Sequence, residues 1–311
     1  MTKEVSVGLF NYKNGGRTRN GNYEFSGLQQ TFDTTGEAPA LILLNEAKGW
    51  KANGNQTLHM AVNALSERLK RPYVGEIGCG IRGDATTPAL IYDPTRLRLD
   101  FWGNDSAANK DQENTARMHV MGRQATQFRV AIKQWNPEHG SLRQLEAHNT
   151  SGLTIGMPTL LGGDLNNAAS GLHVDMDWSK ASDRLRKTKA KLLADGTYTA
   201  DTDAMDLMLG DWDAEHETRT KQARALGQEA IGWHALAELA YQNGTPLEEA
   251  IKSTVNRGPE AGGGLLIDWL LVNNAWKEGL VAKTYHVHEP IASDPEDYPS
   301  DHRLVTATLE I

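Results

Sequence analysis

An acid and a histidine, Asp301 and His302, stand side by side just before a strand-like segment at the C-terminal end of the chain. That segment, RLVTATLEI (303–311), alternates in the way typical of a strand with one buried face. A carboxylate can hold a metal ion, and an imidazole can transfer protons or stabilise negative charge. The pair therefore predicts a functional site, provided that other parts of the chain supply its partners.

Other polar residues occupy the same kind of position, within or at the end of an apolar run. They are Asn11 after VGLF, Glu46 after LILLN, Asp164 and Asn166 in LLGGDLNN, and Asp268 within LLIDWLLV. Ligand-binding groups gather at strand ends, where loops are held on a rigid support, and an unpaired buried carboxylate is costly. Each residue alone has a simpler explanation as a turn residue, a surface charge or half of a structural ion pair. Their joint occurrence favours one shared site.

Seven apolar runs bounded by Gly, Asn, Asp and Pro predict the strands that position these residues. The runs are 5–12, 40–47, 88–93, 127–135, 158–166, 265–274 and 303–311. Nearly continuous apolarity in ALILL and LLIDWLLV indicates central strands that are covered on both faces. Apolar residues three or four apart predict a helix over 57–71, and 142–153 is a second helical candidate.

The longest stretch without strand signals, about 168–262, is rich in helix formers with periodic apolar positions. We interpret it as a helical elaboration of one domain spanning 1–311, because no Pro/Ser-rich linker marks its edges; a small separate domain is the alternative. It contains a basic run that is either a phosphate-contacting stripe or an ordinary solvated helix face. The run consists of Arg184, Arg186, Lys187, Lys189 and Lys191.

Composition restricts the class of protein. Hydrophobic residues make up 39% and charged residues 23%, as in soluble globular proteins, and no apolar run approaches the roughly 20 residues that span a bilayer. The first residues lack the apolar core of a signal peptide, and the single cysteine, Cys79, excludes an internal disulfide. We therefore expect a cytoplasmic protein without a membrane partner. The net charge of −8 disfavours tight, metal-free DNA binding, although bound cations or a local basic cleft can offset it.

The order of these segments resembles the endonuclease/exonuclease/phosphatase superfamily, the metal-dependent phosphodiesterases and phosphatases that include DNase I-like nucleases. The resemblance rests on LFNYKNGG, LLNEAKGW, GGDLNN, LLIDWLLVNN and YPSDHRLV, which together reach from Asn11 to His302. It implies an α/β (α+β) fold, a four-layer sandwich of two packed, mainly antiparallel sheets flanked by helices. It also implies hydrolysis of a phosphate ester by in-line attack of water, with Mg²⁺ or Mn²⁺ as the cofactor.

The resemblance assigns the metal to three of these residues. Glu46 is the first implied metal ligand, Asp301 helps to complete the metal environment, and Asn11 orients water or phosphate beside it. Asn45 stands before Glu46 where members of the superfamily usually carry glutamine, so the amide chemistry is kept with a side chain one methylene shorter.

The remaining matched residues receive catalytic roles. Asp164 is implied to accept a proton from the attacking water, with Asn166 positioning that water or a phosphate oxygen. His302 is implied to stabilise or protonate the phosphoryl oxygens, and Asp268 to hold the second imidazole nitrogen.

One position departs from the superfamily. Many members carry histidine or tyrosine at the end of the strand before GDxN, where this chain has Gln134 or Trp135. Gln134 could donate a hydrogen bond to phosphate, and Trp135 could stack on a base or sugar. His139 could replace the missing histidine if its loop folds back. Arg257, before GPEAGGG, is a further candidate for a phosphate contact.

We therefore expect a divalent-metal-dependent phosphodiesterase, an endonuclease or exonuclease with DNA as the first candidate substrate. A phosphatase acting on small molecules or inositol phosphates is the enzymatic alternative. A non-catalytic nucleic-acid-binding or regulatory protein is the second class, which the missing histidine motivates. The other implied site residues are all retained, and this favours catalysis. The sequence leaves the oligomeric state open.

Overall fold

Two six-stranded sheets form the centre of the molecule. The computed structural model describes residues 4–80, 83–103, 112–122, 126–173, 176–291 and 298–311. The first sheet has the order β17-β18-β1-β2-β4-β3, and only its β1–β2 pair is parallel. Its strands are β1 (Glu4–Asn11), β2 (Leu41–Asn45), β3 (Val74–Ile77), β4 (Ala89–Tyr92), β17 (His286–Val287) and β18 (Val305–Glu310).

The second sheet has the order β15-β16-β8-β7-β6-β5, and only its β7–β8 pair is parallel. Its strands are β5 (Leu97–Gly103), β6 (Thr115–Val120), β7 (Gln127–Gln134), β8 (Thr159–Asp164), β15 (His234–Ala235) and β16 (Asp268–Val272). Both sheets are therefore mixed but mainly antiparallel.

Side chains that alternate along the strands fill the space on both faces of the first sheet. Val7 and Leu9 of β1 belong to a core shared with the second sheet, whereas Phe10 belongs to a core shared with helices. In β2, Leu43 and Leu44 divide between the same two cores. Both faces are thus buried, which explains why these segments read as nearly continuous apolar runs.

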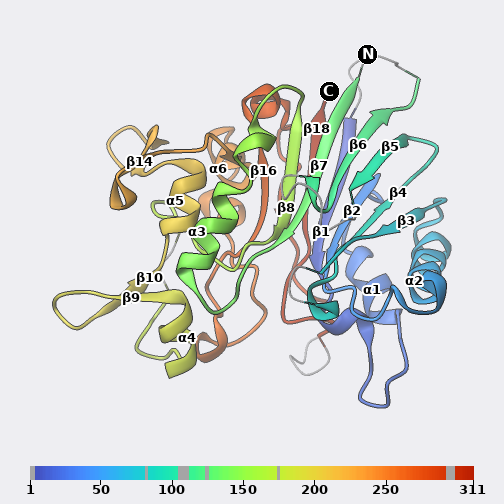
Figure 1. The fold of residues 1–311 in the computed structure, drawn as a ribbon, viewed down its shortest axis with the longest axis horizontal. Coiled ribbons are helices and arrows are strands. Elements are labelled where there is room, and N and C mark those ends of the chain that lie inside the picture. The colour runs from blue at the N-terminus through green and yellow to red at the C-terminus, as the bar shows by residue number, and fades with distance from the viewer. Residues whose placement is uncertain (1–3, 81–82, 104–111, 123–125, 174–175, 292–297) are drawn as a thin grey trace.

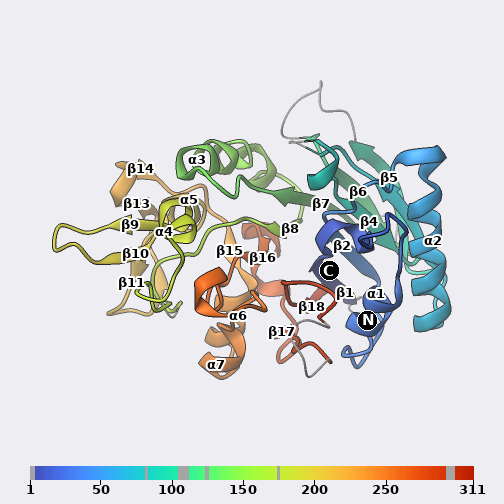
Figure 2. The same cartoon turned by 90° about the horizontal axis from the view of Figure 1, so that it is seen from below.

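Helices cover the outer faces of the two sheets. Figures 1 and 2 show α1 and α2 outside the first sheet, and α3 and α5 outside the second. Their bounds are α1 (Ser26–Phe32), α2 (Ala52–Leu69), α3 (Gly140–His148) and α5 (Asp203–Leu209). The four-layer α+β sandwich that the resemblance implies is confirmed. No helix among the described residues has the combination of length and apolar character that a membrane crossing needs.

Each of the seven predicted strand segments contains a strand, and both predicted helical segments contain a helix. Five strands of the two sheets were not predicted. Among them, β5 alternates exposed and partly buried residues at a sheet edge, and β15 and β17 have two residues each. Short or edge strands bury too little apolar surface to stand out in a sequence.

The segment 168–262 is not helical throughout, so that expectation is wrong in part. Among its described residues, the α-helices are α4 (Asp183–Lys189), α5, α6 (Leu236–Gln242) and α7 (Leu247–Ala250). Between them lie three hairpins, β9 (Ala190–Leu192) with β10 (Tyr198–Ala200), β11 (Trp212–Asp213) with β12 (Thr218–Arg219), and β13 (Gln222–Ala223) with β14 (Gln228–Glu229). Gly196 and Gly227 have positive φ angles in two of the hairpin turns, where they reverse the chain.

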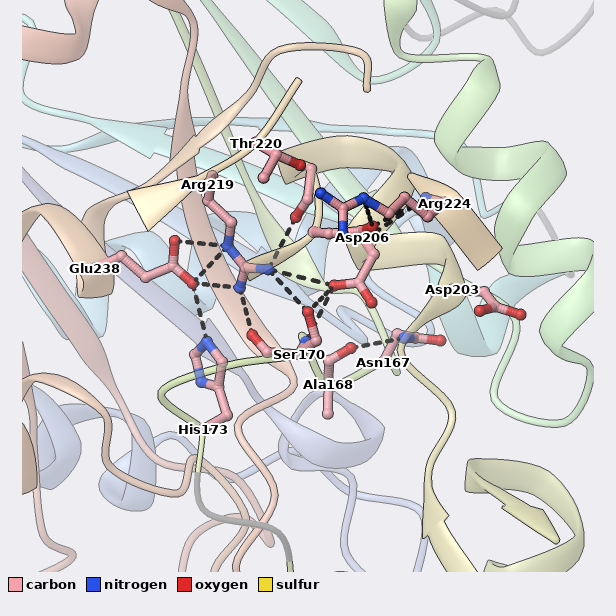
Figure 3. A network of polar contacts seen from close by, with 12 residues as sticks. Asn167, Ala168, Ser170, His173, Asp203, Asp206, Arg219, Thr220, Arg224 and Glu238 are labelled. Carbon is pink, nitrogen blue, oxygen red and sulfur yellow. Dashed lines mark hydrogen bonds and ion pairs between the residues drawn. The ribbon is translucent and has the colours of Figure 1, made fainter. Parts of the chain in front are cut away.

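A buried charge network holds the later part of this segment against its first residues, which lie in the loop that follows β8 (Figure 3). The Arg219 guanidinium donates to Glu238 Oε2 at 3.1 Å, to Asp206 Oδ1 at 3.3 Å and to the Ser170 carbonyl at 2.7 Å. His173 Nε2 lies 3.1 Å from Glu238 Oε1. Burial alone would raise the pKa of Glu238, but the charge of Arg219 and the hydrogen bond from His173 outweigh it and lower the pKa to about 2.

We predict that this network makes the fold sensitive to acid. Because the folded-state pKa of Glu238 lies below its unfolded value of 4.5, its stabilisation is fully present above pH 4.5 and is lost as the pH falls toward 2. The free energy of unfolding should therefore fall by about 2 kcal/mol between pH 6 and pH 3 through this group. Urea unfolding of the wild type and of Glu238→Gln at both pH values measures it. An equal acid-induced loss in the two proteins would contradict the prediction.

Candidate active site

Strand register aligns polar residues at one end of each sheet. The last residue of β8, Asp164, is paired with Gln134 of β7 on one side and with Asp268 of β16 on the other. In the first sheet, Asn11 at the end of β1 is paired with Asn45 at the end of β2. Neighbouring strands lie about 5 Å apart, so register alone brings these side chains into contact distance.

Hydrogen bonds between the sheets connect the polar strand-end residues of one sheet with those of the other. Asn45, which is fully buried, accepts from the Asp164 backbone N–H at 3.0 Å and donates to the Lys133 carbonyl at 3.1 Å. Asn11 Nδ2 donates to Asp164 Oδ2 at 3.1 Å. Gly162 of β8 permits this approach, since a Cβ there would lie 2.5 Å from the Leu43 side chain of the other sheet. The GGD segment is therefore required for packing as well as for the carboxylate.

His302 is oriented by Asp268. Its Nδ1 lies 2.8 Å from Asp268 Oδ2, and the Asp268 backbone N–H donates to Thr254 Oγ1 at 3.1 Å. Ser300 Oγ accepts from the His302 backbone N–H at 3.2 Å and donates to the Asn11 carbonyl at 2.6 Å. The motif SDH is thus fixed to two strands, and it leaves His302 Nε2 as the nitrogen opposite the Asp268 contact.

Burial alone would lower the pKa of His302, but the charge and hydrogen bond of Asp268 and the charge of Asp164 outweigh it. The net effect raises the pKa well above its usual value. A raised pKa favours the imidazolium form, which donates hydrogen bonds to phosphoryl oxygens.

The pKa of Asp164 is raised to about 6, mainly by burial, with Asp268 acting in the same direction and His302 and Lys189 opposing it. Its Oδ1 accepts from the Asn166 backbone N–H at 3.0 Å. A carboxylate whose pKa is close to neutral can take up a proton during a reaction at physiological pH.

The predicted metal ligands lie beside this pair. Glu46 Oε1 accepts from Gln134 Nε2 at 3.0 Å and from Asn11 Nδ2 at 3.3 Å. Asp301 Oδ2 accepts from Lys13 Nζ at 2.7 Å. Burial alone would raise the pKa of Asp301, but the charge of His302 and the contact with Lys13 outweigh it and lower the pKa.

Glu46, Asp301 and Asn11 offer carboxylate and amide oxygens, which Mg²⁺ and Mn²⁺ accept as ligands. These oxygen ligands fit a hard divalent cation. Among the described residues, the buried acceptors Asn11 Oδ1, Gln134 Oε1 and Asp268 Oδ1 have no hydrogen-bond donor. Buried acceptors of this kind need a cation or ordered water as a partner.

A second arrangement, Asp164, Asp268 and His302, has possible ligand atoms within 4.8 Å of one another. Within this group, His302 Nδ1 lies 2.8 Å from Asp268 Oδ2. We therefore interpret these three residues as an acid–histidine pair beside a proton acceptor.

Two site residues have a strained backbone. Glu46 has a φ angle of 59° and Asn166 one of 53°, although neither is glycine. Left-handed conformations at non-glycine residues persist where surrounding contacts enforce them, and they concentrate at functional sites.

A cavity of about 640 Å³ opens onto this cluster. Its wall includes Gln134 and five of the predicted catalytic and metal-binding residues, namely Glu46, Asp164, Asn166, Asp301 and His302. Four cations also line it, Lys13, Arg184, Lys189 and Arg257. Asn11 and Asp268 are fully buried behind this wall.

The structure corrects the interpretation of Trp135. Gln134 reaches the site, but Trp135 is 1% exposed and belongs to the main hydrophobic core, so it cannot stack on a substrate. His139, the alternative replacement, directly precedes α3 and is not among the residues that line the cavity. Among the described residues that line the cavity, no phenylalanine, tyrosine or tryptophan takes the place of Trp135.

The side chains of the basic run, 184–191, lie in different places in the structure. Arg184 and Lys189 line the cavity, whereas Arg186 lies over the Tyr198 ring and Lys191 pairs with Asp203. Lys13 was not predicted, although it follows Asn11 closely in LFNYKNGG. A lysine two residues beyond a strand-ending asparagine carries no signal of its own, because its direction depends on the turn.

We predict that Glu46→Gln weakens the binding of Mn²⁺ by about tenfold or more, because one anionic ligand becomes neutral. Isothermal titration of Mn²⁺ into the purified protein measures the change. Glu67→Gln, on the exposed face of α2, is the matched control and should bind as the wild type does. Equal Mn²⁺ affinity in the Glu46 variant and the wild type would exclude Glu46 as a ligand.

No family model matches the sequence, and no curated protein matches it. Among solved structures, an endonuclease/exonuclease/phosphatase family protein from Bacteroides thetaiotaomicron aligns with 100% of this chain and 98% of its own, with a TM-score of 0.57 and 13% identity. ANGEL2, described as a 2',3'-cyclic phosphatase, covers 100% and 97%, with a TM-score of 0.53 and 12% identity. The human Nocturnin catalytic domain, with a bound sulfate anion, covers 99% and 94%, with a TM-score of 0.52 and 11% identity.

The alignments with these structures extend over nearly the whole of each chain, and the sheet arrangement agrees with the one that the sequence resemblance implies. At such low identity the likeness concerns the fold. This chain has the DNase I-like fold of the endonuclease/exonuclease/phosphatase superfamily.

Proposed function

We propose that this chain is a divalent-metal-dependent phosphoric ester hydrolase that cleaves phosphodiester bonds in nucleic acid, with DNA as the first substrate to test. The observation that carries the proposal is the His302–Asp268 pair, 2.8 Å apart, beside the buried carboxylate Asp164 in a cavity shared with Glu46 and Asp301. A proton acceptor, a cationic donor and a set of oxygen ligands in one place are what in-line attack of water on phosphorus requires.

In this mechanism, the water oxygen forms a bond to phosphorus while the ester P–O bond breaks. Asp164 takes the proton that the water loses, and its position is fixed by the Asn11 amide and the Asn166 backbone N–H. His302 donates from Nε2 to a phosphoryl oxygen, and Asp268 stabilises the positive charge of the ring. The departing oxygen takes a proton from solvent.

Glu46 and Asp301, which line the cavity, are the residues that would hold Mg²⁺ or Mn²⁺. The buried Asn11 Oδ1 has no hydrogen-bond donor among the described residues. When bound, the cation neutralises negative charge on the phosphate and supports the leaving oxygen. The Gln134 amide donates a hydrogen bond to Glu46. Gln134 therefore contacts a residue that would hold the metal.

The charge pattern of the cavity supports a substrate with more than one phosphate. Lys13, Arg184, Lys189 and Arg257 surround the acidic centre, and cations tracking a backbone are the usual means of binding a nucleic acid strand. A second candidate substrate is a nucleoside 2',3'-cyclic phosphate, because a neighbour of the same fold is described as a 2',3'-cyclic phosphatase. The cavity of about 640 Å³ is large enough for a mononucleotide.

The test is hydrolysis of labelled single-stranded and double-stranded DNA with Mg²⁺, Mn²⁺ or EDTA. The parallel panel contains RNA, a 2',3'-cyclic nucleotide, an inositol phosphate and a generic phosphodiester, with Asp164→Asn as the control. Metal-dependent cleavage of DNA that is lost in the control supports the nuclease, and product lengths then separate endonuclease from exonuclease action.

Hydrolysis of another ester in the panel would change the proposed substrate class and leave the proposed active site unchanged. A folded protein that hydrolyses nothing in the panel would contradict the proposal and favour a binding protein that kept the fold.

A further inference from the structure

Helix α4 brings a lysine to the catalytic centre from outside the two sheets. Ser182 caps the helix, since its Oγ accepts from the Leu185 N–H at 3.3 Å, and the helix ends at Lys189. Arg184, Leu185 and Lys189 line the active-site cavity, whereas Lys187 is exposed and does not line it. The helix therefore forms part of the cavity wall through one of its faces.

Lys189 contacts the segment that carries Asp164. Its Nζ donates to Asn166 Oδ1 at 2.6 Å and to the Asn166 carbonyl at 2.8 Å. Asn166 Nδ2 donates to the Trp135 carbonyl at 3.1 Å. The amide of Asn166 is thus held at its oxygen by α4 and at its nitrogen by the chain after β7, which fixes the orientation of the amide.

Arg143 of α3 fastens the end of α4 to the same loop. This fully buried guanidinium donates to Asn167 Oδ1 at 2.6 Å, to the Thr188 carbonyl at 3.1 Å and to Asp201 Oδ2 at 2.9 Å. The Asp201 backbone N–H also donates to the Lys189 carbonyl at 2.8 Å. The backbone on both sides of Lys189 is therefore anchored, so its ammonium group is pre-organised.

The other cations of the cavity are placed differently. Lys13 is paired with Asp301, Arg257 Nε lies 4.0 Å from the same carboxylate, and the Arg184 side chain is 81% exposed and pairs with Glu138. At the end of β7, the chain offers the neutral amide of Gln134. Lys189 places a positive charge at Asn166, two residues beyond Asp164 and on the cavity wall. A fixed positive charge stabilises the negative charge that develops as water attacks phosphorus.

We propose that Lys189 is a further active-site residue, which positions the Asn166 amide and presents a fixed positive charge to the substrate phosphate. The proposal rests on the proposed function of the same site. Through Lys189, helix α4 has a role in turnover in addition to its place in the cavity wall.

The test compares Lys189→Met with Lys187→Met, the same substitution on the exposed side of the same helix. With the substrate that the wild type cleaves, kcat should fall about a hundredfold in Lys189→Met and stay unchanged in Lys187→Met. Lys189→Arg should recover part of the loss, because it keeps the charge. In the double variant Lys189→Met/Asn166→Ala, the loss should be smaller than the product of the two single losses, since Lys189 acts in part through Asn166.

A second readout is independent of turnover. Equilibrium binding of a fluorescent oligodeoxynucleotide in EDTA should weaken about tenfold in Lys189→Met and remain unchanged in Lys187→Met. If the wild type cleaves nothing, the proposed function fails, and this binding comparison alone decides the role of Lys189. Wild-type binding and wild-type kcat in Lys189→Met would overturn the inference. Unfolding of both Lys189→Met and Lys189→Gln would also overturn it, since Lys189 would then be a structural anchor.

Discussion

Asp164→Asn should lower kcat by about a thousandfold or more and leave the fold intact. The amide that replaces the carboxylate cannot take the proton of the attacking water, and general base catalysis contributes typically 10²–10⁴-fold. The Asn166 backbone N–H and Asn11 Nδ2 both donate to Asp164. An asparagine offers only one acceptor oxygen, so one of these two bonds is lost, and a modest decrease in stability accompanies the loss of activity.

The measurement is kcat on the substrate that the wild type cleaves best, together with a thermal melt followed by circular dichroism. Asp195→Asn, in the exposed turn of the β9–β10 hairpin, is the matched control. The control should retain full activity. Activity within about tenfold of wild type in Asp164→Asn would exclude Asp164 as the principal proton acceptor.

Asp268 could be recognised from the sequence for a physical reason. A carboxylate flanked by apolar residues on both sides needs a buried partner, and that partner is His302, a bond that joins β16 to the segment before β18. The pairing of Asp164 with both Gln134 and Asp268 was not predictable, because register depends on how three separate strands align.

Trp135 shows where reasoning from position along a strand fails. The last residue of β7, Gln134, points into the site, and the next side chain turns into the core, where Trp135 contributes a large apolar surface. Which of two adjacent residues faces a cavity follows from side-chain alternation once the strand end is known, and strand ends are the least certain feature of a sequence-based prediction.

The sequence did not predict the contact of Lys189 or the hairpins of 168–262, and the reason is a different one. Helix formers and periodic apolar residues favour helices in this segment, yet the structure contains short helices alternating with hairpins that pack around Arg219 and Arg143. Tertiary contacts override local propensity where each element is only a few residues long. The contact from Lys189 to Asn166 depends on that packing.

His302→Ala should also lower kcat by about a thousandfold, because the imidazolium donor to the phosphoryl oxygens is lost. This variant should lose more stability than Asp164→Asn does, since it leaves the fully buried Asp268 carboxylate without its imidazole partner. Breaking a buried pair by removing one partner destabilises by about 3–5 kcal/mol. Urea unfolding and kcat, measured on the same preparation, separate the two effects.

A double variant distinguishes chemistry from folding. In His302→Ala/Asp268→Asn the buried negative charge is gone, so the free energy of unfolding should recover by about 1–3 kcal/mol while kcat stays at the level of the single variant. His59→Ala, an exposed histidine on α2, is the control for the substitution itself. Recovery of activity together with stability would show that His302 acts only by supporting the fold, and retained activity in both His302→Ala and Asp164→Asn would remove the catalytic assignment of this site.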